Sequence, residues 1–421
     1  MHSSKNRWAA AVVGIAASAL VLSACSAGTG GESTEGVELT AWGAQTTTDA
    51  TKAMIEAYEE ETGNTINLEI IPDGFDENLL TQWATGARPD ILFGQPLQGA
   101  LLKLNPTKNL QDLSDMAFVE STKFGLEEAG TVDGVHYTAT YGFPTLFGLF
   151  SNTEVLAANG LEVPTTQAEL DTAIATLTAA GVPAFGVTGG DAWTTQLPFF
   201  TRVTDAVADG LVEEINTGEA EWTDPRAVEA LEWVQGLVTN GSTNPNASTA
   251  VFGDDAAMLE NGEVAFVAQG TWLTPAFTGG LENIEFTAFP SESGAVMWHS
   301  SNLVSIQLPI TGDETKEAAA REFVDFATVG DGYQVYLEET GEPSVIEGVD
   351  DPADLDPVQQ KIVAAFEGSI PSIDTQSAAS LGDFPGLMGQ LIAGTLTPEQ
   401  VAEQLQLQFA DNAKQAGIEG F

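Results

Sequence analysis

At 421 residues the chain is longer than a single hydrophobic core usually supports, and its 61 acidic and 13 basic residues give a formal charge of −48. A surface of this sign repels phosphate backbones and so excludes nucleic acid as a partner, while 43% hydrophobic residues exclude a disordered chain. The charge also disfavours anionic ligands, which leaves neutral or cationic solutes.

The N-terminal segment has the pattern of a secretory signal. Residues 1–8 carry Lys5 and Arg7 and no acid, and residues 9–22 are all small or apolar. A transmembrane helix needs about 20 such residues, so this run is too short to span a bilayer and fits the apolar region of a signal peptide. Residues 1–24 are therefore predicted to be a signal peptide that is removed.

The single cysteine, Cys25, comes directly after this segment. The sequence Leu-Ser-Ala-Cys at residues 22–25 resembles the lipobox of bacterial lipoproteins, in which the cysteine is acylated and becomes the first mature residue. The resemblance implies that Cys25 anchors the protein in the outer face of the cell membrane. Residues 25–36 would form the anchor and a flexible tether. No thiol is then left for a disulfide, a metal site or a nucleophile.

Strands and helices alternate in the first part of the mature chain. Residues 37–43 (VELTAWG) predict a strand that runs into a loop at Trp42, and residues 47–63 carry an apolar stripe of helical spacing. Residues 65–71 (TINLEII) alternate as a half-buried strand does, and residues 88–93 (RPDILF) predict another short strand. This alternation predicts a parallel α/β sheet covered on both faces.

The same alternation returns in the second part of the chain. Thr166 and Glu169 form a capping-box pattern ahead of a helical apolar stripe, and residues 183–187 (PAFGV) predict a strand. Asp224, followed by a proline, predicts the start of another helix, and Thr397 does the same for the last long helix. The chain is therefore α/β throughout, and its length favours two lobes.

Four stretches resemble the extracellular solute-binding proteins (family 1) of sugar-type ABC importers, and they occur in the family's order. They are residues 87–96 (a cleft-edge strand), 141–170 (a crossover between lobes), 256–273 (a helix, a strand and a loop ending in Gly-Thr-Trp) and 302–326 (a returning strand and helix). One position departs from the pattern, because the family's Tyr-Asn pair at the crossover is Ser151-Asn152 here.

The resemblance implies a two-lobe fold of the periplasmic-binding-protein type (type II), with a hinged cleft that closes on the ligand. The first lobe would hold residues 37–143 and 291–340, and the second would hold residues 144–290 and 341–421. It also implies a monomeric substrate-binding protein that captures a mono- or oligosaccharide and delivers it to the permease subunits of an ABC importer. Such a protein is not an enzyme and needs no cofactor or metal.

A sugar-binding cleft needs aromatic planes for the C–H faces of the sugar and polar side chains for its hydroxyls. Loop ends of this chain carry that mixture, and the expected ligand-binding residues are Trp42, Asp73, Gln95, Gln98, Tyr141, Phe143, Asp191, Trp193, Trp272, Trp298, His299 and Asn302. By resemblance, Trp193 and Trp272 lie in loops that stack on sugar rings in the family. Trp83, Trp222 and Trp233 lie in helical patterns and are expected in the core.

Two other interpretations stay open. A glycan hydrolase would need two carboxylates at a set separation. The chain has 61 acidic residues, which are too many for the sequence to identify a catalytic pair. A serine triad has little support, because no Gly-x-Ser-x-Gly elbow occurs and the mature chain has only His136 and His299. A cationic solute such as a polyamine would suit the charge as well as a sugar does. Residues 348–356 lack the ordered pattern of a calcium loop.

Overall fold

The computed structural model describes residues 36–44, 47–71, 75–94, 96, 98–123, 126–299, 304–353, 355, 357–366, 368–418 and 420–421. Cys25 and the predicted signal peptide lie outside the described residues, and so do Asp73, Gln95 and Asn302 of the predicted site. Within the described part of the chain, no helix combines the length and the apolar character needed to cross a bilayer.

The first sheet contains five strands in the order β2 (Thr65–Ile71), β1 (Glu38–Ala44), β3 (Ile91–Gly94), β12 (Ser305–Gln307) and β6 (Ala139–Thr140). β1 pairs in parallel with both β2 and β3, as the alternation predicted. β12 runs antiparallel to β3 and to β6, so the sheet is mixed and not parallel throughout. The predicted loop at Trp42 is wrong, because β1 continues through this residue to Ala44.

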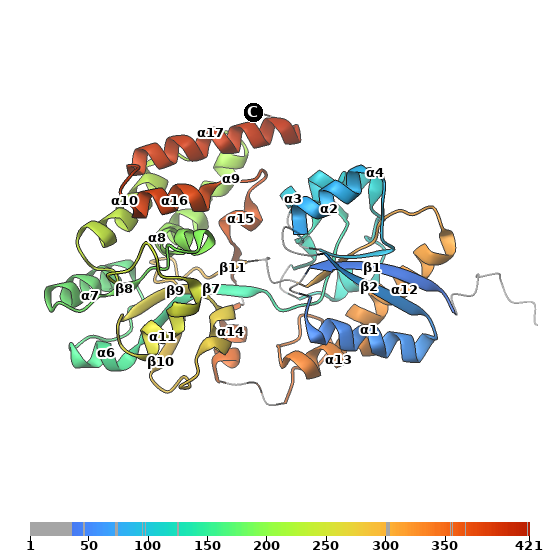
Figure 1. Cartoon of the computed structure of the whole chain (residues 1–421), viewed down its shortest axis with the longest axis horizontal. Helices are drawn as coiled ribbons and strands as arrows, with labels where there is room; N and C mark the ends of the chain where they lie inside the picture. Colours follow the sequence, from blue (N-terminus) through green and yellow to red (C-terminus); the bar gives the residue numbers. More distant parts are fainter. Residues whose placement is uncertain are drawn as a thin grey trace, which may run out of the picture. The chain divides into compact units, whose positions relative to one another are not determined.

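Helices cover both faces of the first sheet (Figure 1). They are α1 (Asp49–Thr62), α2 (Phe75–Ala84), α3 (Gln98–Leu104), α4 (Pro106–Asn109), α5 (Ala117–Ser121), α12 (Glu314–Thr328) and α13 (Asp331–Thr340). Successive residues of a strand face opposite ways. Ala41 accordingly packs in the core cluster that contains Tyr58 of α1 and Phe323 of α12, whereas Trp42 packs with Leu79 of α2. The short η1 (Leu126–Glu128) and the pair β4 (Thr131–Val132) and β5 (Val135–His136) complete this part.

The second sheet is built around β7 (Thr145–Asn152), in which every residue is buried. Its order is β13 (Ile370–Pro371), β11 (Met297–His299), β7, β9 (Phe266–Gly270) and β8 (Phe185–Gly186), and β10 (Ile284–Ala288) also pairs with β7. β9, β10 and β11 all run antiparallel to β7, whereas β8 is parallel to β9 and β13 is parallel to β11, so this sheet is mixed as well. β11 belongs to this sheet although the predicted division places residues 291–340 in the first lobe.

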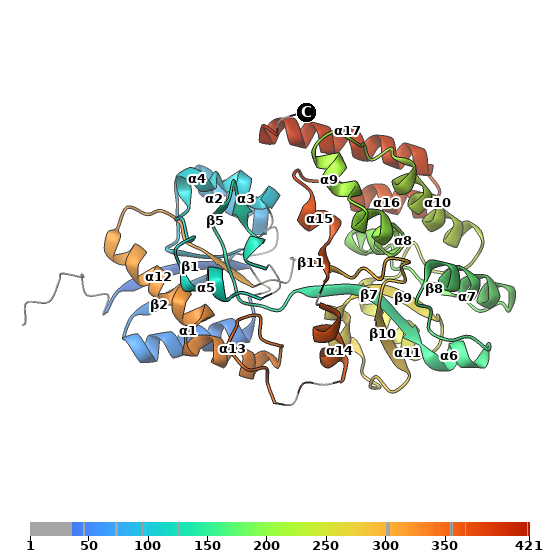
Figure 2. The ribbon, with the colours of Figure 1, turned by 180° about the vertical axis from the view of Figure 1, so that it is seen from behind.

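The helices of the second part are α6 (Thr153–Ala158), α7 (Gln167–Ala179), α8 (Leu197–Ala208), α9 (Leu211–Asn216), α10 (Pro225–Thr239), α11 (Asp255–Glu260), α14 (Pro357–Phe366), α15 (Ile373–Gln376), α16 (Phe384–Ile392) and α17 (Pro398–Ala416). The predicted helix starts are confirmed: Thr166 forms a capping box, and Asp224 and Thr397 cap α10 and α17. α16 and α17 lie against α10 (Figure 2), and all three bury their apolar faces in one core cluster.

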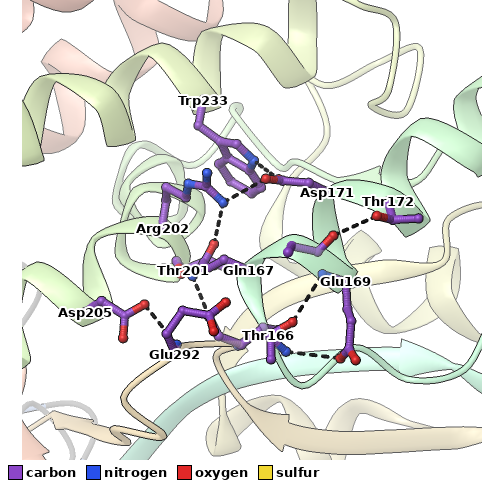
Figure 3. Close-up of polar contacts among 12 residues, drawn as sticks. Thr166, Gln167, Glu169, Asp171, Thr172, Thr201, Arg202, Asp205, Trp233 and Glu292 are labelled. Carbon is purple, nitrogen blue, oxygen red and sulfur yellow. Dashed lines mark hydrogen bonds and ion pairs between the residues drawn. The ribbon is translucent and has the colours of Figure 1, made fainter.

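The three tryptophans predicted in the core differ in burial. Trp83 and Trp222 are buried, as predicted. Trp233 of α10 is only half-buried, and it lies in a polar network that joins α7, α8 and α10 (Figure 3). Its indole N–H donates to Asp171 at 2.8 Å, and Arg202 donates to the other oxygen of the same carboxylate at 3.1 Å. Trp233 thus links α10 to α7, and its indole N–H has a hydrogen-bond acceptor.

Candidate functional site

Aromatic side chains from four separate segments meet above β7. Trp272 of η4 (Thr271–Ala276) lies 5.8 Å between ring centroids from Trp193 of η2 (Ala192–Gln196), and Trp193 lies 5.1 Å from Phe252 of η3 (Phe252–Asp254). His299, at the end of β11, faces Trp272 edge-on at 6.5 Å. We name these four residues, Trp193, Phe252, Trp272 and His299, the aromatic cluster.

Phe147 of β7 supports the aromatic cluster from the core side. Its ring lies 5.6 Å from Trp272 in an edge-to-face arrangement and 5.2 Å from His299. Phe147 is only 2% exposed, whereas Trp193 is 39% exposed. The cluster therefore runs from a buried base to an open aromatic face, which is the form of a platform that can stack on an apolar ligand surface.

Gly270 explains how Trp272 reaches this position. A Cβ atom on Gly270 would lie 2.6 Å from Cγ2 of Thr145 and 2.7 Å from the indole ring of Trp272. Both distances are far below van der Waals contact, so only glycine lets the indole fold back over the end of β9.

Polar side chains hold the cluster from behind. The indole N–H of Trp272 donates to Oε1 of Gln269 at 3.0 Å, and Nε2 of Gln269 donates to Oδ2 of Asp255 at 2.5 Å. Asp191 accepts the backbone N–H of Phe252 at 2.8 Å, so its carboxylate joins η2 to η3. Nε2 of His299 lies 3.1 Å from Oδ2 of Asp374, which sets the orientation of the imidazole. The stacking surface is therefore preorganised.

The structure thus brings together Asp191, Trp193, Trp272 and His299 of the predicted site residues. Four others are at most 8% exposed and pack in hydrophobic clusters: Trp42, Tyr141, Phe143 and Trp298. The Tyr141 hydroxyl lies 3.2 Å from Oγ1 of Thr51, and burial raises the pKa of this tyrosine well above its ordinary value. Phe143 and Trp298 both contact the ring of Phe366. Gln98 is the first residue of α3.

Sequence reasoning missed Phe252, Gln269 and Asp255. Gln269 gave a usable signal, because it is a polar residue at the end of an otherwise apolar strand, and such a residue needs a buried partner. Asp255 gave none, since an acid in the first turn of a helix is ordinarily a surface residue that favours the helix dipole. In the structure it is 1% exposed.

Comparisons with known proteins agree with this architecture. Residues 53–373 match the family described as "Bacterial extracellular solute-binding protein". No curated protein sequence gives a match.

Solved structures of similar fold include a chitin oligosaccharide binding protein (TM-score 0.73, 20% identity, covering 90% of this chain and 99% of that chain). RafE in complex with raffinose is similar with a TM-score of 0.69 and 22% identity over 89% of this chain and 99% of that chain. An ABC transporter solute-binding protein from Thermotoga lettingae TMO bound with α-D-tagatose is also similar, with a TM-score of 0.69 and 19% identity over 89% of this chain and 99% of that chain. These TM-scores show the shared α/β fold, and the family match over most of the chain shows that this protein belongs to the bacterial extracellular solute-binding proteins, which bind and do not catalyse.

Proposed function

We propose that this protein is the substrate-binding lipoprotein of an ABC import system and that it captures a neutral mono- or oligosaccharide for the membrane permease. The observation that carries the proposal is the aromatic cluster with its polar surroundings. The proteins of similar fold bind chitin oligosaccharides, raffinose and tagatose, so this frame accepts sugars of different lengths.

The chemistry of the cluster suits a sugar. The C–H face of a pyranose is apolar and fits the exposed face of Trp193 or Trp272, while its hydroxyls need acceptors and donors at the rim of that face. Asp191 lies at this rim and can meet hydroxyls, whereas His299 is only 8% exposed and supports the aromatic cluster from within. A formal charge of −48 repels anionic ligands but does not act on a neutral sugar.

Lobe closure is part of the proposal. The chain passes between the two sheets after β6, again after β11 and again between α13 and β13. We expect the lobe built on the first sheet and the lobe built on the second sheet, to which β11 belongs, to close on the ligand about these connections. A ligand with contacts to both lobes binds the closed form better and shifts the population toward it. Solution scattering should then give a smaller radius of gyration at ligand saturation, and an unchanged radius would contradict closure.

A ligand panel tests the class of solute. A ligand at about 100 times its Kd adds about 2.7 kcal/mol to the free energy of unfolding, which thermal unfolding detects. The panel should contain neutral mono- and oligosaccharides, sugar acids and polyamines. Stabilisation by a neutral sugar that is recovered unchanged supports the proposal. Stabilisation by polyamines alone assigns a cationic solute, and cleavage of an oligosaccharide would contradict the proposal.

The lipid anchor rests on residues 22–25 and has its own test. Cys25→Ala should leave a folded, ligand-binding protein that keeps its signal peptide or is released into the medium, because the acyl acceptor is lost. Ser26→Ala is the matched control and should stay in the membrane fraction. Native protein that carries no acyl mass on its N-terminus would refute the anchor.

A further inference from the structure

A buried carboxylate lies directly behind the aromatic cluster. Asp255 opens α11 and is 1% exposed. Its hydrogen bonds within the described residues come from two neutral groups, Nε2 of Gln269 at 2.5 Å and Oγ1 of Thr188 at 3.4 Å. Burying a carboxylate without a cation costs free energy. The position of Asp255 therefore needs an explanation that fold stability does not supply.

The hydrogen bonds from Trp272 to Asp255 can run in only one direction when Asp255 is ionised. An ionised carboxylate only accepts, so the nitrogen of the Gln269 amide must face Asp255. The amide oxygen of Gln269 then faces the other way, toward the indole N–H of Trp272 at 3.0 Å. Because an indole N–H only donates, this is the amide orientation that Trp272 requires.

We propose that Asp255 is a positioning residue of the ligand site, which fixes the indole of Trp272 through the side-chain amide of Gln269. The aromatic cluster contacts the ligand, and this assignment of ligand contact rests on the proposed function. The order of groups from buried to exposed is then Asp255, Gln269, Trp272 and the ligand. The hydrogen bonds from Gln269 to Asp255 and from Trp272 to Gln269 both lie in the part of the site that is closed to solvent, where water competes least for them.

The arrangement makes the indole sensitive to pH. Burial raises the pKa of Asp255 to about 7, and the nearby carboxylates of Asp254 and Asp191 act in the same direction, while the bonds from Gln269 and Thr188 oppose the rise. A protonated Asp255 can donate its O–H to the amide oxygen of Gln269. The amide can then turn its NH₂ group toward Trp272, and two donors would face each other. Acidification through pH 7 should therefore loosen the indole.

Indole N–H resonances of the ligand-free, ¹⁵N-labelled protein test the proposal between pH 5 and pH 8.5. The Trp272 resonance is assigned as the one that disappears in Trp272→Phe. It should shift with a midpoint near pH 7, and this titration should be lost in Asp255→Asn. Gln269→Met, which keeps the side-chain length but has no amide, should also abolish it. The second variant keeps the test valid if Asp255→Asn does not fold.

Four other ionisable side chains lie in this region, and their effects have to be separated from that of Asp255. His299, paired with Asp374, lies edge-on to Trp272, and Asp191 and Asp254 lie near Asp255. The titration should persist in His299→Gln and in Asp254→Asn. A Trp272 resonance that still titrates in Asp255→Asn, or that stops titrating in His299→Gln, overturns the proposal. Since no ligand is added, failure here is distinct from a ligand panel that finds no sugar.

Discussion

Replacement of Trp272 by alanine should weaken ligand binding and also lower the stability of the fold. The indole is half-buried, it packs against both large core clusters, and its N–H is bonded to Gln269. One part of its surface therefore contributes to folding in the absence of ligand. The remaining part is available for stacking on a sugar.

The structure sets the size of both effects. A buried tryptophan covers about 150–250 Å², so half of the side chain is about 100 Å². At about 25 cal/mol per Å² the ligand-facing half contributes about 2.5 kcal/mol, which is a loss of about 60-fold in affinity. The buried half should reduce the free energy of unfolding by about as much, and the cavity left behind adds to this loss.

Calorimetric titration at pH 8.5 with the sugar found by the panel, together with guanidinium unfolding, measures both effects. Trp233→Ala is the matched control, because Trp233 is also half-buried and its N–H also donates to a side chain, Asp171 at 2.8 Å. It should lower stability by about as much as Trp272→Ala, by the same area argument, and leave the affinity of the folded protein unchanged. If Trp272→Ala binds normally and only unfolds earlier, the ligand site is not at the aromatic cluster.

Three further predictions concern the same site. Trp193→Ala should weaken binding and should lower the free energy of unfolding by less than Trp272→Ala does, because Trp193 is 39% exposed; a larger loss of stability than in Trp272→Ala would refute this. Asp255 has its pKa raised from 3.8 to about 7, so its contribution to stability is fully present below pH 3.8 and is lost as the pH rises through 7. Between pH 4 and pH 8 the free energy of unfolding of the wild type, measured with denaturant, should fall by about 4 kcal/mol relative to that of Asp255→Asn. If the free energies of the two proteins change with pH in parallel, this prediction is wrong. Gly270→Ala should displace Trp272, lower the free energy of unfolding by about 1–3 kcal/mol and reduce affinity, whereas Gly236→Ala, whose new Cβ would meet nothing closer than 3.8 Å, should do neither.

Local signals in the sequence predicted the elements well. Helix starts such as Thr166 and Asp224 were found because a cap and its bonded N–H lie within three residues of each other. Strand partners were not predicted, because the pairing of β12 with β3 joins residues far apart in the chain. That pairing turns an apparently parallel sheet into a mixed one, and no short-range pattern contains it.

The predicted site residues divide according to the element on which they lie. Trp193 and Trp272 lie on short 3₁₀ turns after strands, where side chains leave the sheet and can meet. Trp42 and Trp298 lie inside strands, and the alternation of a strand decided their environment. Within β11, His299 contacts Phe147, which supports the aromatic cluster, while the adjacent Trp298 contacts Phe366. A prediction that took both as loop residues could not separate them.

In so acidic a chain most carboxylates are exposed to solvent, so the buried ones are those whose positions need a structural or functional explanation. Asp90 and Asp255 are buried acids of the described residues, and the carboxylate of Glu342, which accepts the N–H of Phe143 and the hydroxyl of Tyr336, is enclosed as well. Asp90 accepts both the N–H and the hydroxyl of Thr40, and Lys316 of α12 lies 3.2 Å from it, so its burial is explained by an ion pair that joins the first sheet to a helix. Asp255 has neutral donors instead, and one of them leads to the most enclosed tryptophan of the aromatic cluster. Glu342 shows that an enclosed carboxylate with neutral donors can also belong to the fold, so the strongest reason to assign Asp255 to binding is the chain of hydrogen bonds that leads from it through Gln269 to Trp272.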